Sequence, residues 1–257
     1  MATRRRIPQW VRVTYNTLTQ FVDPRGVVSA LRNTGAFVSD YRAYSKLTGA
    51  ERLSLADLQP CLHDRTGVHP LDAHYYHVNP WAARRIVAAA PRFHVDVGSQ
   101  TVLSTILSAV LPTVYVDFRP LAAPIANWTN VAGDLLRLPL RNDSVQSLSC
   151  LHVAEHVGLG RYGDALDPGG TRGAANELTR VLAPRGNLLF AVPVGRERVA
   201  FNAHRIHDPR TIVDYFGSLR LREFSGVRDD GSYAENLPLA EFHDSSYACG
   251  MFWFVKP

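Results

Sequence analysis

The sequence predicts an α/β fold built on a mostly parallel sheet, and three observations lead to this prediction. From residue 93 onward, short β-rich runs alternate with segments whose apolar residues recur at helical spacing, a pattern typical of strands joined by crossover helices. The interval 229–248 is polar and shows no crossover helix, which indicates that the last strand pairs antiparallel. Hydrophobic residues make up 46% of the chain and charged residues 20%, as in a folded globular protein rather than a disordered one.

Seven strands are expected in chain order, over residues 93–98, 113–118, 128–132, 145–153, 187–194, 219–227 and 250–256. Helices are expected between them over residues 101–111, 173–182 and 208–216. The second of these helices meets a stop signal at Pro184 and Gly186. The third begins with Asp208 and Pro209, a capping residue followed by the residue that is favoured at the first helical position.

Residues 1–90 lack this alternating pattern, because their apolar positions are scattered and Pro60, Pro70 and Pro80 interrupt them. We expect short helices and loops there, which form a helical N-terminal extension. Residues 91–257 are expected to form one domain. A chain of 257 residues suffices for one main core and is short for two enzyme domains.

The formal net charge of +5 is concentrated at the N-terminus, where Arg4, Arg5 and Arg6 supply three of the charges. The rest of the chain is nearly balanced and lacks a broad basic and aromatic pattern, so a nucleic-acid partner is not expected. The favoured interpretation of the basic run is a tail that leads into a packed helix. The alternative is peripheral contact with an anionic membrane surface.

Three cysteines, Cys61, Cys150 and Cys249, are an odd number at wide spacing, which fits neither a disulfide framework nor a zinc cluster. No apolar stretch reaches the roughly 20 residues that span a bilayer, and the start lacks a signal-peptide core. We therefore expect a cytoplasmic protein, at most peripheral at the inner face of the membrane. Nothing in the sequence indicates the oligomeric state.

Two acidic residues follow early strands at the spacing of a nucleoside site. The first strand runs through Asp96 to Gly98 and Ser99, and in a doubly wound sheet this turn lies at the carboxyl edge, where glycine lets a ligand approach the backbone. The second strand ends at Asp117, about twenty residues later, where a carboxylate can accept hydrogen bonds from both ribose hydroxyls. The alternatives are a tight turn at Gly98 and a helix cap at Asp117. The lone glycine argues against a dinucleotide, which needs a fuller fingerprint.

Further motifs flank the third to fifth strands: Gly133-Asp134-Leu135, Leu138-Pro139-Leu140, Leu151-His152-Val153-Ala154-Glu155-His156-Val157 and the stretch from Glu177 to Leu188. Together with the first two strands they resemble the class I S-adenosylmethionine-dependent methyltransferases over residues 93–256. Residues 152–162 and 201–205 also resemble domain-of-unknown-function family 268, a methyltransferase-like group. The resemblance implies a Rossmann-like seven-stranded sheet and S-adenosylmethionine as the cofactor.

The same resemblance implies where the cofactor lies. Asp117 is expected at the ribose, and Asp134, an acid followed by an apolar residue, at the adenine amino group. The turn after Gly98 departs from the family, which has further glycines where this chain has Ser99 and Gln100. The expected cofactor-binding residues are Asp96, Gly98, Ser99, Asp117, Phe118, Asp134, Leu135 and His152.

Methyl transfer from a sulfonium requires that an acceptor is aligned with the methyl carbon and loses a proton. Imidazole has the unperturbed pKa nearest the working pH, so His156 or His204 is expected as the base, with His152 third. The glycine-rich insertion at 158–170 is expected to form a lid over a polar acceptor, and residues 1–90 to cap the domain or contribute to the acceptor site. Acceptor-binding residues are expected at Glu155, Arg161, Tyr162, Asp164, Asn202 and Arg205.

The favoured function is O-methylation of a sugar hydroxyl in a glycan or glycosylated metabolite, and thus a role in glycan biosynthesis, because the lid is polar and several histidines can deprotonate a hydroxyl. RNA 2′-O-methylation is one alternative, which the positive net charge favours. A non-catalytic scaffold that binds the cofactor or a nucleotide-sugar is another.

Metal ligation is a separate question. His152, Glu155 and His156 resemble the "glutamate-x-x-glutamate-histidine" set of some quinone and small-RNA O-methyltransferases, in which a divalent ion holds the acceptor oxygens. Here a histidine replaces the first glutamate, which moves the set away from the oxygen ligands that magnesium prefers. We expect no metal; in the alternative, Glu155 and His156 are the ligands.

Overall fold

The computed structural model describes residues 11, 14, 18–19, 24–63, 72–119 and 121–257. The chain divides into two compact units, Met1–Pro70 and Leu71–Pro257. Arg4, Arg5 and Arg6, on which the predicted tail and membrane contact depend, lie outside the described residues. Within the part of the chain that is described, no helix is both long and apolar enough to span a bilayer.

The described residues of the first unit include one long helix, α2 (Pro24–Tyr44), and the 3-10 helix η1 (Leu55–Asp57). The side-chain amide of Asn33 donates a hydrogen bond to the Leu62 carbonyl oxygen at 2.6 Å. This contact ties α2 to the segment that follows η1.

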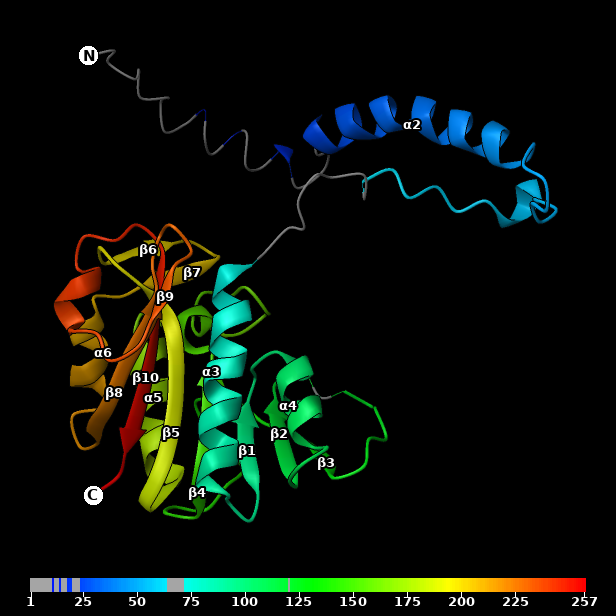
Figure 1. Cartoon of the computed structure of the whole chain (residues 1–257). Coiled ribbons are helices and arrows are strands. Elements are labelled where there is room, and N and C mark those ends of the chain that lie inside the picture. The colour runs from blue at the N-terminus through cyan, green and yellow to red at the C-terminus, as the bar shows by residue number, and fades with distance from the viewer. Residues whose placement is uncertain (1–10, 12–13, 15–17, 20–23, 64–71, 120) are drawn as a thin grey trace. The chain divides into compact units, whose positions relative to one another are not determined.

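The described residues of the second unit form an eight-stranded sheet in the order β3-β2-β1-β4-β5-β10-β8-β9 (Figure 1). The first five strands of this order are parallel, whereas β10 pairs antiparallel with both β5 and β8. The α/β class and the antiparallel last strand are therefore confirmed. The strands are β1 (His94–Val97), β2 (Thr113–Asp117), β3 (Trp128–Ala132), β4 (Val145–Leu151), β5 (Leu182–Val194), β8 (Arg220–Val227), β9 (Tyr233–Ala234) and β10 (Ala248–Val255).

The sheet of the described residues has one strand more than the seven predicted. After β8 the chain turns at Gly231, whose φ is +85°, and returns as β9, with Val227 opposite Tyr233. A strand of two residues has too few alternating positions to produce a recognisable pattern. The sequence pattern of the polar interval 229–248 therefore does not reveal this strand.

Helices cover both faces of the sheet. Leu188 and Phe190 of β5 pack in the core that includes α5 (Gly170–Val181) and α6 (Pro209–Tyr215), while Leu189 and Ala191 pack in the core that includes α3 (Ala73–Ala89) and α4 (Thr101–Leu107). Successive side chains of a strand point to opposite faces, so the two helix pairs lie on opposite sides. The capping prediction is confirmed, since Asp208 Oδ1 accepts a hydrogen bond from the Arg210 N–H at 2.8 Å.

The division between the two units lies before α3 and not near residue 90, where the sequence placed it. Val78, Trp81 and Ile86 of α3 are buried in the second unit. The Trp81 indole N–H donates to Glu223 Oε1 on β8 at 3.0 Å. These apolar positions recur at helical spacing, but Pro80 was interpreted as an interruption, whereas the helix accommodates it on an exposed face.

Candidate functional site

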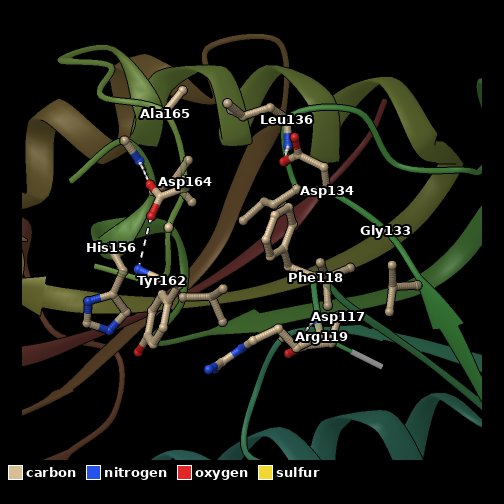
Figure 2. Close-up of a pocket in the computed structure, with 18 of the residues that line it drawn as sticks. Asp117, Phe118, Arg119, Gly133, Asp134, Leu136, His156, Tyr162, Asp164 and Ala165 are labelled. Carbon is tan, nitrogen blue, oxygen red and sulfur yellow. Dashed lines mark hydrogen bonds between the residues drawn. The ribbon is translucent and has the colours of Figure 1, made fainter. Parts of the chain in front are cut away.

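A cavity of about 400 Å³ opens at the carboxyl ends of β1, β2 and β4 (Figure 2). Because β2 and β4 lie on opposite sides of β1, the crossovers diverge there and leave the crevice in which open α/β sheets bind ligands. The volume is in the range of small-molecule sites. Six of the eight predicted cofactor-binding residues line it: Gly98, Asp117, Phe118, Asp134, Leu135 and His152.

Gly98 presents backbone to the cavity. Its φ of +67° lies in the left-handed region, and its N–H donates to the Val116 carbonyl oxygen at 2.9 Å, which ties the turn after β1 to β2. A Cβ at this position would lie 2.9 Å from Val153 Cγ1. The turn therefore requires glycine both for its conformation and for its space.

Asp117 is the last residue of β2, and two hydrogen bonds within the protein hold its carboxylate in place. Its Oδ1 accepts a hydrogen bond from the Arg119 N–H at 2.7 Å, and its Oδ2 lies 3.0 Å from the Tyr115 hydroxyl. Each carboxylate oxygen can accept more than one hydrogen bond. Asp117 can thus accept from two hydroxyls of a ligand without losing its own supports.

Asp134 is the second carboxylate near this part of the cavity, together with Asp117. Its Oδ1 accepts a hydrogen bond from the Leu136 N–H at 2.9 Å. In Figure 2, the side chains of Phe118, Asp134 and Leu136 gather at one end of the cavity. Phe118 is 57% exposed and Leu136 37%, so both present open apolar surface to the cavity. Apolar surface with a hydrogen-bond acceptor at its edge fits a flat base that carries an amino group.

Asp96 and Ser99 were predicted to contact the cofactor, but neither lines the cavity. Asp96 is fully buried, and its Oδ1 accepts hydrogen bonds from the Ser99 and Ser149 hydroxyls, both at 2.5 Å. Ser99 Oγ in turn accepts from the Leu151 N–H at 3.0 Å. The two residues therefore do not contact a ligand in the cavity but fix the turn after β1 against β4.

This network continues to His94, and its hydrogens can be assigned. Because the Ser149 hydroxyl donates to Asp96, it accepts from His94 Nε2–H at 2.9 Å, and the Ser147 hydroxyl donates to His94 Nδ1 at 2.8 Å. Burial lowers the pKa of His94 to about 3, consistent with this neutral tautomer. Burial also raises the pKa of Asp96 to about 6, against the hydrogen bonds from Ser149 and Ser99.

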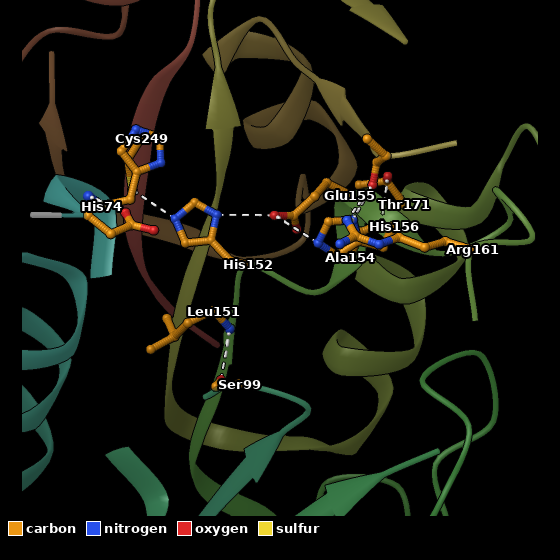
Figure 3. Close-up of polar contacts among 12 residues, drawn as sticks. His74, Ser99, Leu151, His152, Ala154, Glu155, His156, Arg161, Thr171 and Cys249 are labelled. Atoms are coloured by element: carbon orange, nitrogen blue, oxygen red, sulfur yellow. Dashed lines mark hydrogen bonds and ion pairs between the residues drawn. The ribbon is translucent and has the colours of Figure 1, made fainter. Parts of the chain in front are cut away.

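His152, Glu155 and His156 lie at the other end of the cavity, where η2 (Ala154–His156) follows β4 (Figure 3). The His152 Nδ1–H donates to Glu155 Oε1 at 3.1 Å, and His152 Nε2 lies 3.3 Å from Cys249 Sγ. Although burial opposes the shift, Cys249 and Glu155 raise the pKa of His152 to about 10. The pKa of the buried Glu155 is lowered by His152, again against the effect of burial.

His156 lines the cavity with a defined tautomer. Its Nδ1–H donates to the Ala203 carbonyl oxygen at 2.6 Å, so Nε2 is the unprotonated nitrogen. Nε2 lies 3.8 Å from Glu155 Oε1. An imidazole held in this way can take a proton at Nε2, and the nearby carboxylate stabilises the resulting charge.

The glycine-rich insertion folds around Asp164. Its Oδ2 accepts from the N–H groups of Gly158 at 2.7 Å and Gly160 at 3.4 Å, and its Oδ1 accepts from the Tyr162 N–H at 3.2 Å. Burial opposes the change, but these backbone donors lower the pKa of Asp164. The Tyr162 ring lines the cavity and lies 4.7 Å from the guanidinium carbon of Arg119, so this segment reaches across to the loop after β2.

The remaining predicted acceptor and catalytic residues are not on the cavity wall. Arg205 is buried and donates to the carbonyl oxygens of Val157 and Asp167. Asn202 is exposed between β6 (Arg198–Ala200) and β7 (His204–Ile206). Glu155 is buried behind His156. Two further residues lie near His156. Arg161 donates to the Ala203 carbonyl oxygen at 3.0 Å, and the His204 ring lies 6.4 Å from that of His156.

Sequence reasoning missed Tyr115 and Arg119, which lie two residues before and after Asp117. The signal for Tyr115 was its position on β2, because residues i and i+2 of a strand share one face. Arg119 carries no comparable signal, since its contact is with Tyr162 in a different loop.

Comparisons with known proteins agree with this architecture. Residues 140–227 match the family described as a Caenorhabditis protein of unknown function, DUF268. None of the curated proteins matches the sequence. Among solved structures, a putative methyltransferase in complex with the Haloferax volcanii Trm112 activator is 15% identical with a TM-score of 0.51, over 72% of this chain and 90% of that one.

Two further structures share the fold. N-methyltransferase NodS from Bradyrhizobium japonicum is 14% identical with a TM-score of 0.50, over 72% of this chain and 98% of that one. The (4+2)-cyclase SpnF is 13% identical with a TM-score of 0.51, over 70% and 80%, so the fold supports more than one chemistry. This chain has the Rossmann-like fold of the class I S-adenosylmethionine-dependent methyltransferases and resembles the DUF268 family over residues 140–227.

Proposed function

We propose that the chain is an S-adenosylmethionine-dependent methyltransferase that acts on a hydroxyl of a sugar, in a glycan or a glycosylated metabolite. The cavity itself is the observation that carries the proposal. One end offers the paired carboxylates of Asp117 and Asp134 beside exposed apolar side chains, and the other end offers His156. The chain thus has complementary places for a nucleoside and for an acceptor that must lose a proton.

The described residues fit the cofactor. Gly98 leaves backbone where a Cβ would collide with Val153, and Asp117 keeps acceptor capacity toward the cavity. At Gly133, which also lines the cavity, a Cβ would lie 2.5 Å from Val116 Cγ1. The bound cofactor would supply a methyl group activated by its sulfonium.

The chain's own contribution to the reaction is positioning and proton removal. His156 Nε2 takes the proton of the acceptor hydroxyl, because Nδ1–H is held by the Ala203 carbonyl oxygen. Glu155 stabilises the imidazolium that results. Tyr162, held by the turn around Asp164, covers the acceptor and excludes water.

This base supports a hydroxyl acceptor, and the polar surroundings support a sugar. His156, Tyr162 and Asp164 offer a hydrogen-bonding surface at the acceptor end, which suits a molecule with several hydroxyls. Glycan biosynthesis and a cytoplasmic location remain part of the proposal.

The test is incubation of the purified chain with methyl-labelled S-adenosylmethionine and separated glycan, small-metabolite and RNA pools. Label is expected in the glycan or glycosylated-metabolite pool. His156→Ala is expected to lower turnover roughly 10²–10⁴-fold with little change in cofactor affinity, whereas His63→Ala in the first unit retains the wild-type rate. Label in RNA alone would contradict the sugar acceptor, and cofactor binding without transfer to any pool would support a non-catalytic scaffold.

A further inference from the structure

Three metal-ligating side chains from three separate elements converge behind the cavity. His74 lies on α3, His152 follows β4 and Cys249 lies on β10, and one ligating atom of each lies within 4.8 Å of the other two. Figure 3 shows His152 between His74 and Cys249 on one side and Glu155 on the other. His152 and Cys249 are buried, and His74 is half-buried.

We propose that His74, His152 and Cys249 form a zinc site. Imidazole nitrogen and thiolate sulfur are ligands that zinc prefers, whereas magnesium and calcium prefer oxygen. Around a tetrahedral zinc ion, with bonds of ~2.0–2.3 Å, donor atoms lie roughly 3.3–3.8 Å apart. Cys249 Sγ and His152 Nε2 are already 3.3 Å apart. The His74 ring stacks on the His152 ring with centroids 5.3 Å apart, and its ligating nitrogen lies within 4.8 Å of both other donors, so His74 has to move closer to them when an ion binds.

Glu155 supports the proposed site from behind. Its Oε1 accepts the Nδ1–H of His152 at 3.1 Å, so Nε2, the nitrogen that faces Cys249, is the one that binds an ion, in exchange for its proton. A carboxylate that holds a ligating histidine in this manner is the usual support in zinc proteins. The charges also balance, because a divalent ion offsets one thiolate and the buried Glu155 carboxylate.

Aromatic rings enclose the cluster. The Tyr247 ring stacks on His74 with centroids 5.1 Å apart, and the Tyr75 ring meets His152 edge-on at 5.4 Å. Cys249 has no exposed surface, so it is poorly placed to act as a nucleophile on an external substrate. The half-buried His74 provides the side from which an ion enters. Three protein ligands leave the fourth tetrahedral position to water or to a bound molecule.

This site differs from the Glu155–His156 pair that the sequence suggested as metal ligands. It uses Glu155 only as a support, and it involves neither His156 nor the cofactor carboxylates. It shares His152, which lines the cavity, and Glu155 with the proposed methyltransferase site. Zinc uptake is nevertheless measured without methyl transfer, so a failure of one proposal can be told from a failure of the other.

The test is metal titration of the full chain after its metal has been removed with a chelator. Co²⁺ serves as the optical probe, and Zn²⁺ is then titrated against a chromophoric chelator. We expect uptake of one ion per chain and a near-ultraviolet thiolate-to-cobalt band that Zn²⁺ abolishes. Cys249→Ser removes the band, and Glu155→Gln weakens Zn²⁺ affinity by about 10–100-fold.

Matched variants separate the ligands from other residues of the same type. Cys61→Ser, at an exposed cysteine, and His77→Gln, on the same helix as His74, are expected to bind Zn²⁺ like the wild type. His74→Gln is expected to bind more weakly, and circular dichroism of the metal-free variants checks that each is folded. If the wild type takes up no ion, takes up only copper, or binds zinc equally well after Cys249→Ser or His74→Gln, the proposal is wrong.

Discussion

The Tyr115 hydroxyl lies between the Ser99 carbonyl oxygen, 2.9 Å away, and Asp117 Oδ2, 3.0 Å away. Its single proton is shared between an acceptor on the turn after β1 and one at the end of β2. Tyr115 is almost completely buried, so it fixes the spacing of the two turns that form one wall of the cavity.

The first prediction concerns this link. Asp117→Ala is expected to weaken S-adenosylmethionine binding by about 1.5–3 kcal/mol, the range for hydrogen bonds to a charged group, and Tyr115→Phe by a smaller amount, because Tyr115 only positions the Asp117 carboxylate. Calorimetric titration measures both. Tyr76→Phe, at an exposed tyrosine of α3, controls for loss of a hydroxyl. An Asp117→Ala variant with the wild-type dissociation constant would remove Asp117 from the site.

The second prediction concerns the turn at Gly98. Gly98→Ala places a Cβ both in the left-handed region and 2.9 Å from Val153 Cγ1, so cofactor binding and stability are expected to fall together. Gly49→Ala is the matched control, because its φ is +82° but nothing lies within 4 Å of the added Cβ. That variant carries only the conformational cost of about 1–2 kcal/mol and leaves the cofactor dissociation constant unchanged. Equal effects of the two variants on binding would contradict the assignment of Gly98.

The third prediction concerns pH and Asp96. Burial, with a contribution from the Asp117 charge, raises its pKa from 3.8 to about 6 in the fold. The folded state therefore holds a proton that the unfolded state loses, and the free energy of unfolding decreases as pH rises from about 4 to 6. Between pH 4.5 and 7.5 the loss amounts to about 2 kcal/mol.

Urea unfolding of the wild type and Asp96→Asn at both pH values measures this effect. The stability of the wild type relative to the variant is expected to be greater at pH 4.5. His94 changes stability in the opposite direction, since burial lowers its pKa, but it is present in both proteins and cancels in the difference. A difference that does not vary with pH would show that Asp96 titrates alike in the folded and unfolded chain.

The fourth prediction concerns the turn around Asp164. Asp164→Asn replaces one of two accepting oxygens by a donor, so at least one backbone N–H loses its partner at a cost of about 1.5 kcal/mol. Faster limited proteolysis within residues 158–164 and a higher KM for the acceptor are expected, with the cofactor dissociation constant unchanged. Asp230→Asn, at another Asx turn on the surface, is the control. Unaltered proteolysis would separate Asp164 from the order of this segment.

The strands were predictable because β-branched runs and polar turns are local signals. The placement of Gly98, Asp117 and Asp134 around one cavity followed from a general property of parallel sheets, and Figure 2 shows the two carboxylates there. The role of Asp96 did not follow, because its partner Ser149 lies on another strand. The residue type of Asp96 does not indicate that its carboxylate is hydrogen-bonded to the neighbouring strand β4 and not to a ligand.

Contacts between distant segments account for the other differences. Arg205 was predicted to bind the acceptor, but its guanidinium donates to the carbonyl oxygens of Val157 and Asp167, near the two ends of the lid segment. His74 and Cys249 are separated by most of the domain and meet only because α3 packs over β10. The wide spacing of the three cysteines carries no information on a site assembled from three elements.

The position of β10 determines the order in which the sheet can be completed during synthesis. β10 follows β8 in the chain but lies between β5 and β8, so the ribosome releases both neighbours before the strand that joins them. Until then each neighbour presents an unpaired edge, the feature through which nascent chains aggregate. Premature termination before residue 248 would leave β8 and β9 detached from the remaining strands, and such a product is expected to be a substrate for chaperones and proteases rather than a smaller enzyme.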